Sequence, residues 1–365
     1  MTSVTVPFAD LHLREDEADV RAAVDRVMAS GWFVLGPELE AFEAEFAAAA
    51  GAAHAVGVAN GTDAIALLLR AVGMPPGAEV LVPALTAPFT ALAVLAAGAR
   101  PVFVDVEPER LTLDPAACEA AITSRTRAIV PVHLYGQAAD MTALTATAER
   151  HGLALVEDCC QAHLGTCAGA PVGTSGAGGA FSFYPSKNLG ALGDAGAVIT
   201  NDAAIAERVR QLRNGGRADR HRHALPGVNS RLDEIQAAVL RARLPRLAGW
   251  TARRRALAQA YRRQLRPEVR TVPECDAGHV YHLFPIRSRD RRSLEAHLSD
   301  AGIETLVHYP IALPEQPAFA ALEPGACPVA REAADEVLSL PLYPGLADRD
   351  VGRVTAAVNA FSGRL

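Results

Sequence analysis

The sequence predicts an α/β fold in which a mainly parallel sheet is covered by helices on both faces. Seven short β-rich runs between residues 54 and 201 are separated mainly by helical or turn-like stretches, the order typical of strand–helix–strand units. The runs are HAVGVAN, AEVLVPAL, RPVFVDV, RAIVPVHLYG, LALVEDCC, GAFSFYP and GAVITN. Because ligand sites in such folds gather at the carboxyl ends of parallel strands, we expect the functional residues there.

The remainder of the chain predicts a second, smaller domain. A helical, arginine-rich stretch from about residue 233 to 266 leads away from the sheet, and HVYHLFPIR and AGIETLVHYP follow as strand-like pieces with helices between them. A chain of 365 residues, half of them hydrophobic, is long enough for two domains. We therefore expect a large α/β domain over residues 1–240 and a small α+β domain over residues 241–365.

Composition narrows the possible functions and locations. A net charge of −6 and the absence of a lysine-rich tract argue against nucleic-acid binding. The apolar run TALAVLAAGA is ended by Arg100 well short of a membrane span, and the N-terminal residues show no apolar core of a secretory signal. The six cysteines form no CxxC pair and no His/Cys ligand spacing, so we expect free thiols in a reducing cytoplasm and no metal site.

One lysine stands out in the sequence. Lys187 is the only lysine among 35 lysine and arginine residues, and it lies in the loop after GAFSFYP, before the glycine-rich turn NLGALGDAG. Arginine can replace lysine at most solvated sites, but a guanidinium stays protonated and cannot act as a primary-amine nucleophile. Lys187 is therefore a candidate for amine chemistry, and an ordinary surface charge is the alternative.

A phosphate site is suggested where the first predicted strand ends. Asn60 and Gly61 break the strand, and Thr62 and Asp63 open an apolar helix. The free backbone N–H groups and the positive end of the helix dipole suit a phosphate, although the same residues would also make an ordinary N-cap.

An acidic pair closes the fifth predicted strand. At the end of this apolar run, the carboxylate of Asp158 needs a cation, solvent or a capping role, because burying it alone would be costly. A phosphate cradle, an acid and an amine at three strand ends together match pyridoxal phosphate (PLP). This cofactor needs phosphate ligands, an acidic partner for its ring nitrogen and a lysine for its aldehyde.

At these residues the sequence resembles the sugar aminotransferases of the DegT/DnrJ/EryC1/StrS group, which have the aspartate-aminotransferase fold (fold type I). The similarity runs through nearly the whole chain, from GPELEAFEAEFA through PVHLYGQAADM and GVNSRLDEIQAAVLRARL to YHLFPIR and HYP. The most specific feature is EDCCQAH followed about two dozen residues later by FSFYPSKNLG. The resemblance implies the PLP-dependent transferase fold type I and a homodimer with active sites shared between subunits.

The resemblance also implies roles for individual residues. Lys187 would be the catalytic residue that bonds the cofactor's aldehyde, Asp158 would pair with the ring nitrogen, and Gln161 would lie near the ring. The phosphate ligands would be Gly61, Thr62, Ser182 and, from the second subunit, Asn229. Many relatives stack an aromatic side chain on the ring where this chain has Ala87, so either Phe89, two residues along, or a different group is expected to cover the ring. The expected substrate-binding residues are His163, Tyr184, Asn188, Arg213, Arg220, His308 and Tyr309, although the arginines of RNGGRADRHRH would also suit a solvated loop.

The activity implied by the resemblance is transfer of an amino group, with glutamate as the donor, to a nucleotide-linked ketodeoxysugar. The expected nucleotide is dTDP, and the expected pathway is amino-sugar or antibiotic biosynthesis. Two alternatives stay open, a ketocyclitol acceptor and a non-catalytic PLP-binding regulator. Lys187 argues against the dehydratases of the group, which have histidine at this position.

Overall fold

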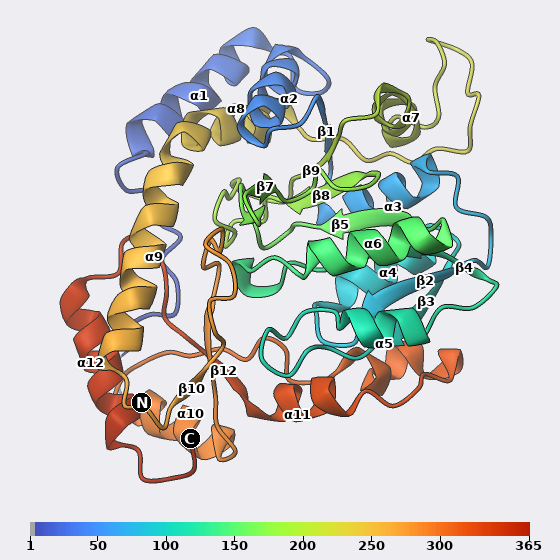
Figure 1. Cartoon of the computed structure of the whole chain (residues 1–365). Helices are drawn as coiled ribbons and strands as arrows, with labels where there is room; N and C mark the ends of the chain where they lie inside the picture. Colours follow the sequence, from blue (N-terminus) through green and yellow to red (C-terminus); the bar gives the residue numbers. More distant parts are fainter. Residues whose placement is uncertain (1–3) are drawn as a thin grey trace.

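The computed structural model describes residues 4–365 and contains a seven-stranded sheet in the order β1-β9-β8-β5-β4-β2-β3 (Figure 1). Within this sheet β9 runs antiparallel to its neighbours β1 and β8, and the other pairs are parallel. All five residues of β2 are buried, as expected for a strand covered on both faces. The predicted α/β fold with a mainly parallel seven-stranded sheet is confirmed. The strands are β1 (His54–Val58), β2 (Glu79–Pro83), β3 (Arg100–Val104), β4 (Thr126–Ile129), β5 (Ala154–Asp158), β8 (Gly178–Ser182) and β9 (Gly196–Thr200).

Helices cover both faces because successive strand residues point to opposite sides. Val80 and Val82 of β2 belong to the core under one helical layer, and Leu81 belongs to the core under the other. The first layer contains α3 (Gly61–Ala71), α4 (Pro88–Ala96) and α7 (Ala203–Arg213). The second contains α2 (Pro37–Ala49), α5 (Pro115–Ala120) and α6 (Met141–His151). Helices α5, α6 and α7 each begin behind an aspartate whose carboxylate accepts backbone N–H groups, namely Asp114, Asp140 and Asp202.

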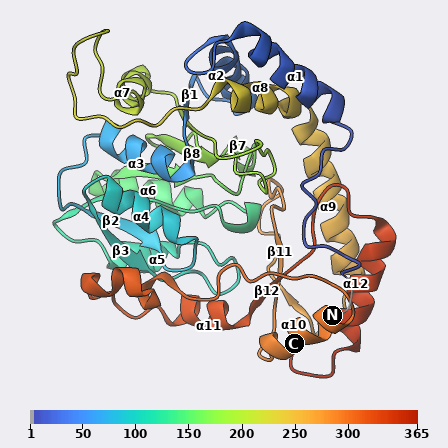
Figure 2. The same cartoon turned by 180° about the vertical axis from the view of Figure 1, so that it is seen from behind.

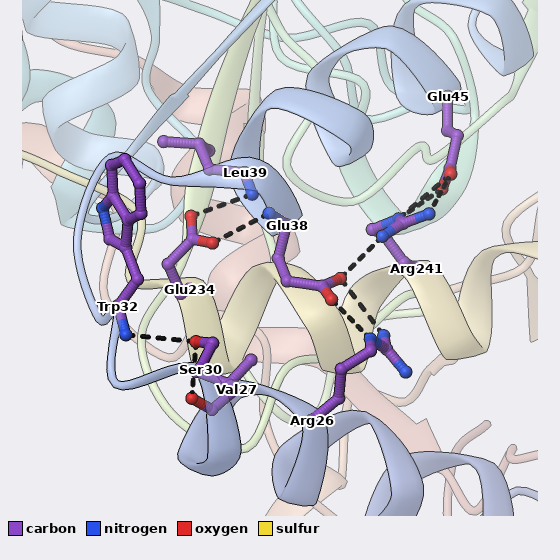
Figure 3. Close-up of polar contacts among 9 residues, drawn as sticks. All are labelled: Arg26, Val27, Ser30, Trp32, Glu38, Leu39, Glu45, Glu234 and Arg241. Atoms are coloured by element: carbon purple, nitrogen blue, oxygen red, sulfur yellow. Dashed lines mark hydrogen bonds and ion pairs between the residues drawn. The ribbon is translucent and has the colours of Figure 1, made fainter.

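Two further helices, α1 (Glu17–Ser30) and α8 (Glu234–Arg243), pack against each other. Helix α8 also packs against α2, and a buried carboxylate network links the three helices (Figure 3). The Glu234 carboxylate accepts the backbone N–H of Gly36 at 2.9 Å and that of Glu38 at 2.8 Å, and so caps α2. The Glu38 side chain in turn binds Arg26 at 2.5 Å and Arg241 at 2.6 Å. These contacts fix the three helices as one unit and hold the exposed loop of residues 31–36 between them.

A second, antiparallel sheet of three strands lies in the C-terminal part of the chain. It forms a separate core with the long helix α9, which runs from α8 toward this sheet along one side of the molecule (Figure 1). The elements are α9 (Leu247–Gln264), β10 (Arg270–Thr271), β11 (Phe284–Arg287), α10 (Arg291–Asp300), α11 (Pro328–Glu336), β12 (Val337–Leu340) and α12 (Asp348–Ala360). A small hairpin of β6 (Thr166–Cys167) and β7 (Ala170–Pro171) follows β5.

One strand prediction in this part is wrong. HVYHLFPIR contains β11, but AGIETLVHYP forms only isolated bridges, from Ile303 to Val6 and from Leu306 to Ser339. Gly302 at its start has a left-handed backbone (φ 75°), and Pro310 at its end has no N–H to donate, so little of the segment can pair. Strand β12 pairs with β11 instead.

The predicted domain boundary at residue 240 falls inside α8, so the division into two domains at that point stays a prediction. Over residues 4–365, none of the helices combines the length and the apolarity that crossing a bilayer requires.

Candidate active site

Lys187 lies in the turn after β8, where its backbone N–H donates to the carbonyl of Tyr184 at 2.8 Å. It lines a cavity of about 470 Å³ between the loop after β8, helix α9 and the N-terminal segment, which runs beside α9 (Figure 2). Other lining residues are Phe8, Asn188, Arg254, His282 and His308.

The Lys187 amine is buried, and its pKa is lower than that of a lysine in water. Removal of the amine from water lowers its pKa, and the nearby Cys160 and Asp158 oppose this shift without cancelling it. A lowered pKa raises the fraction of neutral amine at neutral pH, which is the form that attacks a carbonyl carbon. The geometry therefore fits the amine chemistry expected of the only lysine.

Asp158 is buried at the carboxyl end of β5 and is held by two neutral donors. Its Oδ2 accepts the hydroxyl proton of Thr90 at 2.8 Å, and its Oδ1 accepts the backbone N–H of Cys160 at 3.1 Å. Burial is the main cause of the pKa shifts of Lys187 and Tyr309, and the nearby charge of Asp158 raises the pKa of both groups. Thr90 was not among the residues predicted from the sequence, because its segment PALTAPFTA was used only to find an aromatic side chain that could stack on the cofactor ring.

The neighbouring carboxylate, Glu157, points into a different network. It binds the Nε2 of His133 at 2.9 Å and the backbone N–H groups of Gly173 and Ser175, each at 2.8 Å. His133 accepts the N–H of Ala139 on its Nδ1, so its Nε2 carries the proton given to Glu157. Cys159 lies close enough to this pair for the three side chains to resemble a metal-binding group, but hydrogen bonds already satisfy the carboxylate. The network fixes the end of β5 and leaves Asp158 to face the site.

Gly61 and Thr62, two of the residues predicted to bind phosphate, are the first residues of α3. The side chain of Asn60 accepts the N–H of Asp63 at 2.8 Å, which leaves the N–H groups of Gly61 and Thr62 without a partner within the helix. A Cβ on Gly61 would lie 2.7 Å from the Sγ of Cys160 and 2.8 Å from the Cβ of Ser182. Gly61 thus allows the ends of β1, β5 and β8 to meet closely beside an open helix N-terminus.

Gln161 ties several site residues together. Its Oε1 accepts the backbone N–H of Tyr135 at 2.7 Å, and its Nε2 donates to the hydroxyl of Tyr309 at 3.0 Å. Tyr135 in turn donates its hydroxyl to the carbonyl of His308 at 2.5 Å. Tyr135, whose backbone is left-handed (φ 61°), is a second residue that sequence reasoning missed.

His308 and His282 stand near the lysine. The Nδ1 of His308 lies 3.0 Å from the hydroxyl of Ser339, and burial followed by the charge of Lys187 lowers its pKa to about 4. Burial, followed by the charge of Lys187, also lowers the pKa of His282 well below its usual value. Both imidazoles are therefore neutral at neutral pH. His282 was not among the predicted site residues.

Three of the predicted substrate residues are engaged inside the protein. Arg213 is buried, binds Glu43 and donates to the carbonyl of Gly57 at 2.6 Å, and it is not among the residues that line the cavity of Lys187. His163 lies beside Phe181 and Phe183 and binds the carbonyl of Ser182 at 2.8 Å; burial lowers its pKa to about 3. Asn188 donates to the carbonyl of Val280 at 3.0 Å. These placements do not favour direct substrate contact by Arg213 or His163, whereas Asn188 also lines the cavity.

The other predicted residues lie at the surface of the single chain. Phe89, expected to stack on the cofactor ring, is the second residue of α4 and is 60% exposed. Tyr184 is 52% exposed in the loop before Lys187. Arg220 and Asn229 are exposed in the segment between α7 and α8, where the backbone of Asn229 bridges to Asn214.

Comparisons with known proteins find relatives that match nearly the whole chain. The model of the DegT/DnrJ/EryC1/StrS aminotransferase family matches residues 14–359. Among curated proteins, the chain is 51% identical to the "Erythromycin biosynthesis sensory transduction protein EryC1" of Saccharopolyspora erythraea, with 97% of this chain and 99% of that protein covered. It is 49% identical to the dTDP-3-amino-3,4,6-trideoxy-alpha-D-glucose transaminase of Streptomyces venezuelae, over 99% of this chain and 97% of the relative.

A solved structure gives the same result. The crystal structure of S. venezuelae DesV in complex with a ketimine intermediate superposes with a TM-score of 0.95 at 49% identity and covers 99% of both chains. The chain therefore belongs to the DegT/DnrJ/EryC1/StrS aminotransferase family.

Proposed function

We propose that this aminotransferase uses PLP to move an amino group from glutamate to a dTDP-linked ketodeoxysugar. The observation that carries the proposal is the meeting of three features: a desolvated Lys187 amine, a buried Asp158 carboxylate and an open helix N-terminus at Gly61. The similarity to the S. venezuelae transaminase, whose name includes a dTDP-linked amino sugar, supports this substrate class.

The residues present fit PLP at each of its three ends. The N–H groups of Gly61 and Thr62, with Ser182 beside them, suit the phosphate, and the close packing at Gly61 leaves no room for a larger residue. Asp158, oriented by Thr90 and the N–H of Cys160, suits a protonated ring nitrogen. PLP, when bound, supplies an aldehyde that bonds to amines and a ring that accepts electrons.

Each residue then has a defined task. Lys187 would hold the aldehyde of the cofactor, and its amine, when free, would carry the proton that leaves the α-carbon of the donor. Asp158 would stabilise a proton on the ring nitrogen, which favours the electron-accepting chemistry that the ring would supply. Gln161, held by Tyr135 and Tyr309, would lie near the ring and its phenolic oxygen.

The cradle predicts how the cofactor is retained. Replacing both Thr62 and Ser182 by alanine should weaken PLP retention roughly 10- to 100-fold, because two hydrogen bonds to a charged phosphate are lost. Dialysis against cofactor-free buffer, followed by absorbance of the retained PLP, measures this. Ser124→Ala, at an exposed serine of a loop before β4, is the matched control. Retention equal to wild type would remove these two residues from the site.

We also propose that the protein works as a homodimer in which Asn229 completes the partner's phosphate site. Two large apolar side chains, those of Phe33 and Leu192, are exposed near the N-terminal turn of α8. Hydrogen bonds attach the backbones of both residues to this turn: the carbonyl of Phe33 accepts the N–H of Glu234, and the N–H of Leu192 donates to the side chain of Gln236. Exposed apolar surface of this kind is typical of protein interfaces. Asn229 lies exposed a few residues before this turn.

Mixed dimers test the shared site. Lys187→Ala and Asn229→Ala homodimers should both be impaired, and a dimer with one chain of each kind should regain a single intact site that pairs Lys187 of one subunit with Asn229 of the other. Single-turnover rates of the purified mixed dimer measure this. Sedimentation of the active enzyme as a monomer, or a mixed dimer no better than its parents, would contradict the proposal.

The substrate is tested directly. The pure enzyme is incubated with glutamate, PLP and a panel of TDP-, UDP- and GDP-linked ketosugars together with a ketoinositol, and the product masses are read, with Lys187→Arg as the negative control. We expect amination of a TDP-linked sugar, with Tyr184, Asn188, Arg220, His308 and Tyr309 as the proposed substrate ligands. Amination of the ketoinositol alone would identify a cyclitol enzyme.

A regulatory role is the second candidate, because the relative from S. erythraea is named a sensory transduction protein. The same panel separates an enzyme from a regulator, since a regulator would bind PLP without turnover.

We also propose that the protein is cytoplasmic, and its six free cysteines are consistent with a reducing compartment.

A further inference from the structure

Arg254, on the face of α9 that lines the cavity, is a buried cation without an acidic partner. It is 6% exposed, and its Nη1 donates to the backbone carbonyls of Leu342 at 2.8 Å, His282 at 3.2 Å and Tyr281 at 3.3 Å. Its Nε is buried with no hydrogen-bond partner. Among the ion pairs of residues 4–365, none includes Arg254. Three neutral carbonyls orient the guanidinium but leave its charge uncompensated.

The acidic groups of the cavity are already engaged elsewhere. Asp16 binds Arg243 at 2.7 Å, Asp10 binds Arg14, and Glu15 accepts the indole N–H of Trp250 at 2.8 Å. Among the three arginines that line this cavity, Arg14 and Arg243 have these carboxylate partners, and Arg254 has none. Burial is the cause that lowers the pKa of its guanidinium to about 10, so it stays charged at neutral pH.

Arg254 and Lys187 belong to one site. Arg254 binds the carbonyl of His282, the Nδ1 of His282 lies 3.2 Å from the side-chain oxygen of Asn188, and Asn188 follows Lys187 in the chain. The nearby charges of Lys187 and Arg254 both lower the pKa of His282 and of His163, in addition to the larger effect of burial. Both cations line the same cavity.

We infer that Arg254 binds the α-carboxylate of the amino-acid donor. The inference rests on the proposed aminotransferase function. In an amino acid the carboxylate is attached to the carbon that carries the amine, so a donor whose amine reaches Lys187 must place its carboxylate in the same small space. The diphosphate of a nucleotide sugar is separated from the reacting carbon by the sugar ring and is less suited to a single buried cation beside the lysine. A guanidinium held in one orientation matches a carboxylate.

The test separates the two half-reactions in the holoenzyme. Arg254→Gln and Arg254→Lys are compared with Arg253→Gln, which also removes a carbonyl-binding arginine of α9 but one that pairs with Asp348 away from Lys187. Stopped-flow absorbance follows the reaction of the PLP form with L-glutamate and, separately, that of the aminated cofactor form with the ketosugar.

We expect Arg254→Gln to raise the apparent Kd for L-glutamate roughly 10- to 100-fold. Arg254→Lys should lie between it and wild type, and the sugar half-reaction should be unchanged in each variant. An unchanged Kd for glutamate, or equal losses in both half-reactions, would overturn the inference. A loss confined to the sugar half-reaction would also overturn it and would assign Arg254 to the nucleotide phosphates.

A second measurement needs no variant. Calorimetric titration of the wild-type holoenzyme with glutarate, which has carboxylates but no amine, should show binding that L-glutamate competes away, whereas the neutral diamide glutaramide should not bind. Equal binding of the two compounds would contradict a carboxylate site. Because this titration does not require a correct sugar, failure of the proposed acceptor leaves the test of Arg254 intact.

Discussion

Replacing Lys187 by arginine is expected to abolish transamination while the protein still folds. Arginine keeps the positive charge and much of the length, but its guanidinium cannot bond an aldehyde or take up a proton from carbon. Turnover should therefore fall by roughly 10⁴-fold or more. Product formation measures the loss, circular dichroism confirms the fold, and cofactor absorbance reports the missing bond between lysine and PLP.

A matched control shows whether the position of the lysine matters. In the double variant Lys187→Arg/Arg349→Lys, the chain again has one lysine, now at a site whose side chain is 87% exposed. This protein should remain as inactive as Lys187→Arg. Substantial turnover in either variant would contradict a covalent role for Lys187 and would leave only an electrostatic one.

Asp158→Asn is expected to produce the second-largest loss. A carboxamide is neutral and cannot stabilise a proton on the ring nitrogen, and its NH₂ group cannot accept the hydrogen bond from Thr90 or from the N–H of Cys160. The rate of the glutamate half-reaction should fall on the order of 10³-fold, in line with the removal of one positioned electrostatic group. Single-turnover absorbance of the holoenzyme measures the rate.

Asp105→Asn is the matched control for this substitution. Asp105 also follows a parallel strand, β3, but its carboxylate caps α11 by accepting the N–H groups of Val329 and Ala330. This variant is expected to lose some stability and to keep its half-reaction rate. Equal rates for wild type and Asp158→Asn would show that Asp158 has no role at the ring nitrogen.

The sequence was sufficient for the sheet and for the groups that stand at its strand ends. Strand-length apolar runs separated by helices identify a parallel sheet, and the topology then brings the carboxyl ends of its strands to one edge. Gly61 and Ser182, far apart in the chain, meet at this edge in the structure.

The partners of these groups could not be predicted in the same way. The capping role that the sequence allowed for Asp158 is present, since its carboxylate accepts the N–H of Cys160, but nothing in the sequence indicated its second partner, Thr90, from a helix 68 residues earlier. The sequence also did not show which way the Arg213 side chain points. Arg213 is the last residue of α7, and its side chain points inward to Glu43, unlike the exposed arginines of the following loop. Side-chain direction depends on tertiary packing, which the local pattern of residues does not contain.

Borohydride reduction of the wild-type holoenzyme tests the central claim most directly. The reagent turns a bond between PLP and an amine into a permanent one, and mass spectrometry of the digested protein then locates it. Because Lys187 is the only lysine, only the N-terminal amine can compete. We expect the pyridoxyl group on a single peptide that contains FSFYPSKNLGALGDAG; a labelled peptide without Lys187, or no label on a protein that contains PLP, would contradict the account.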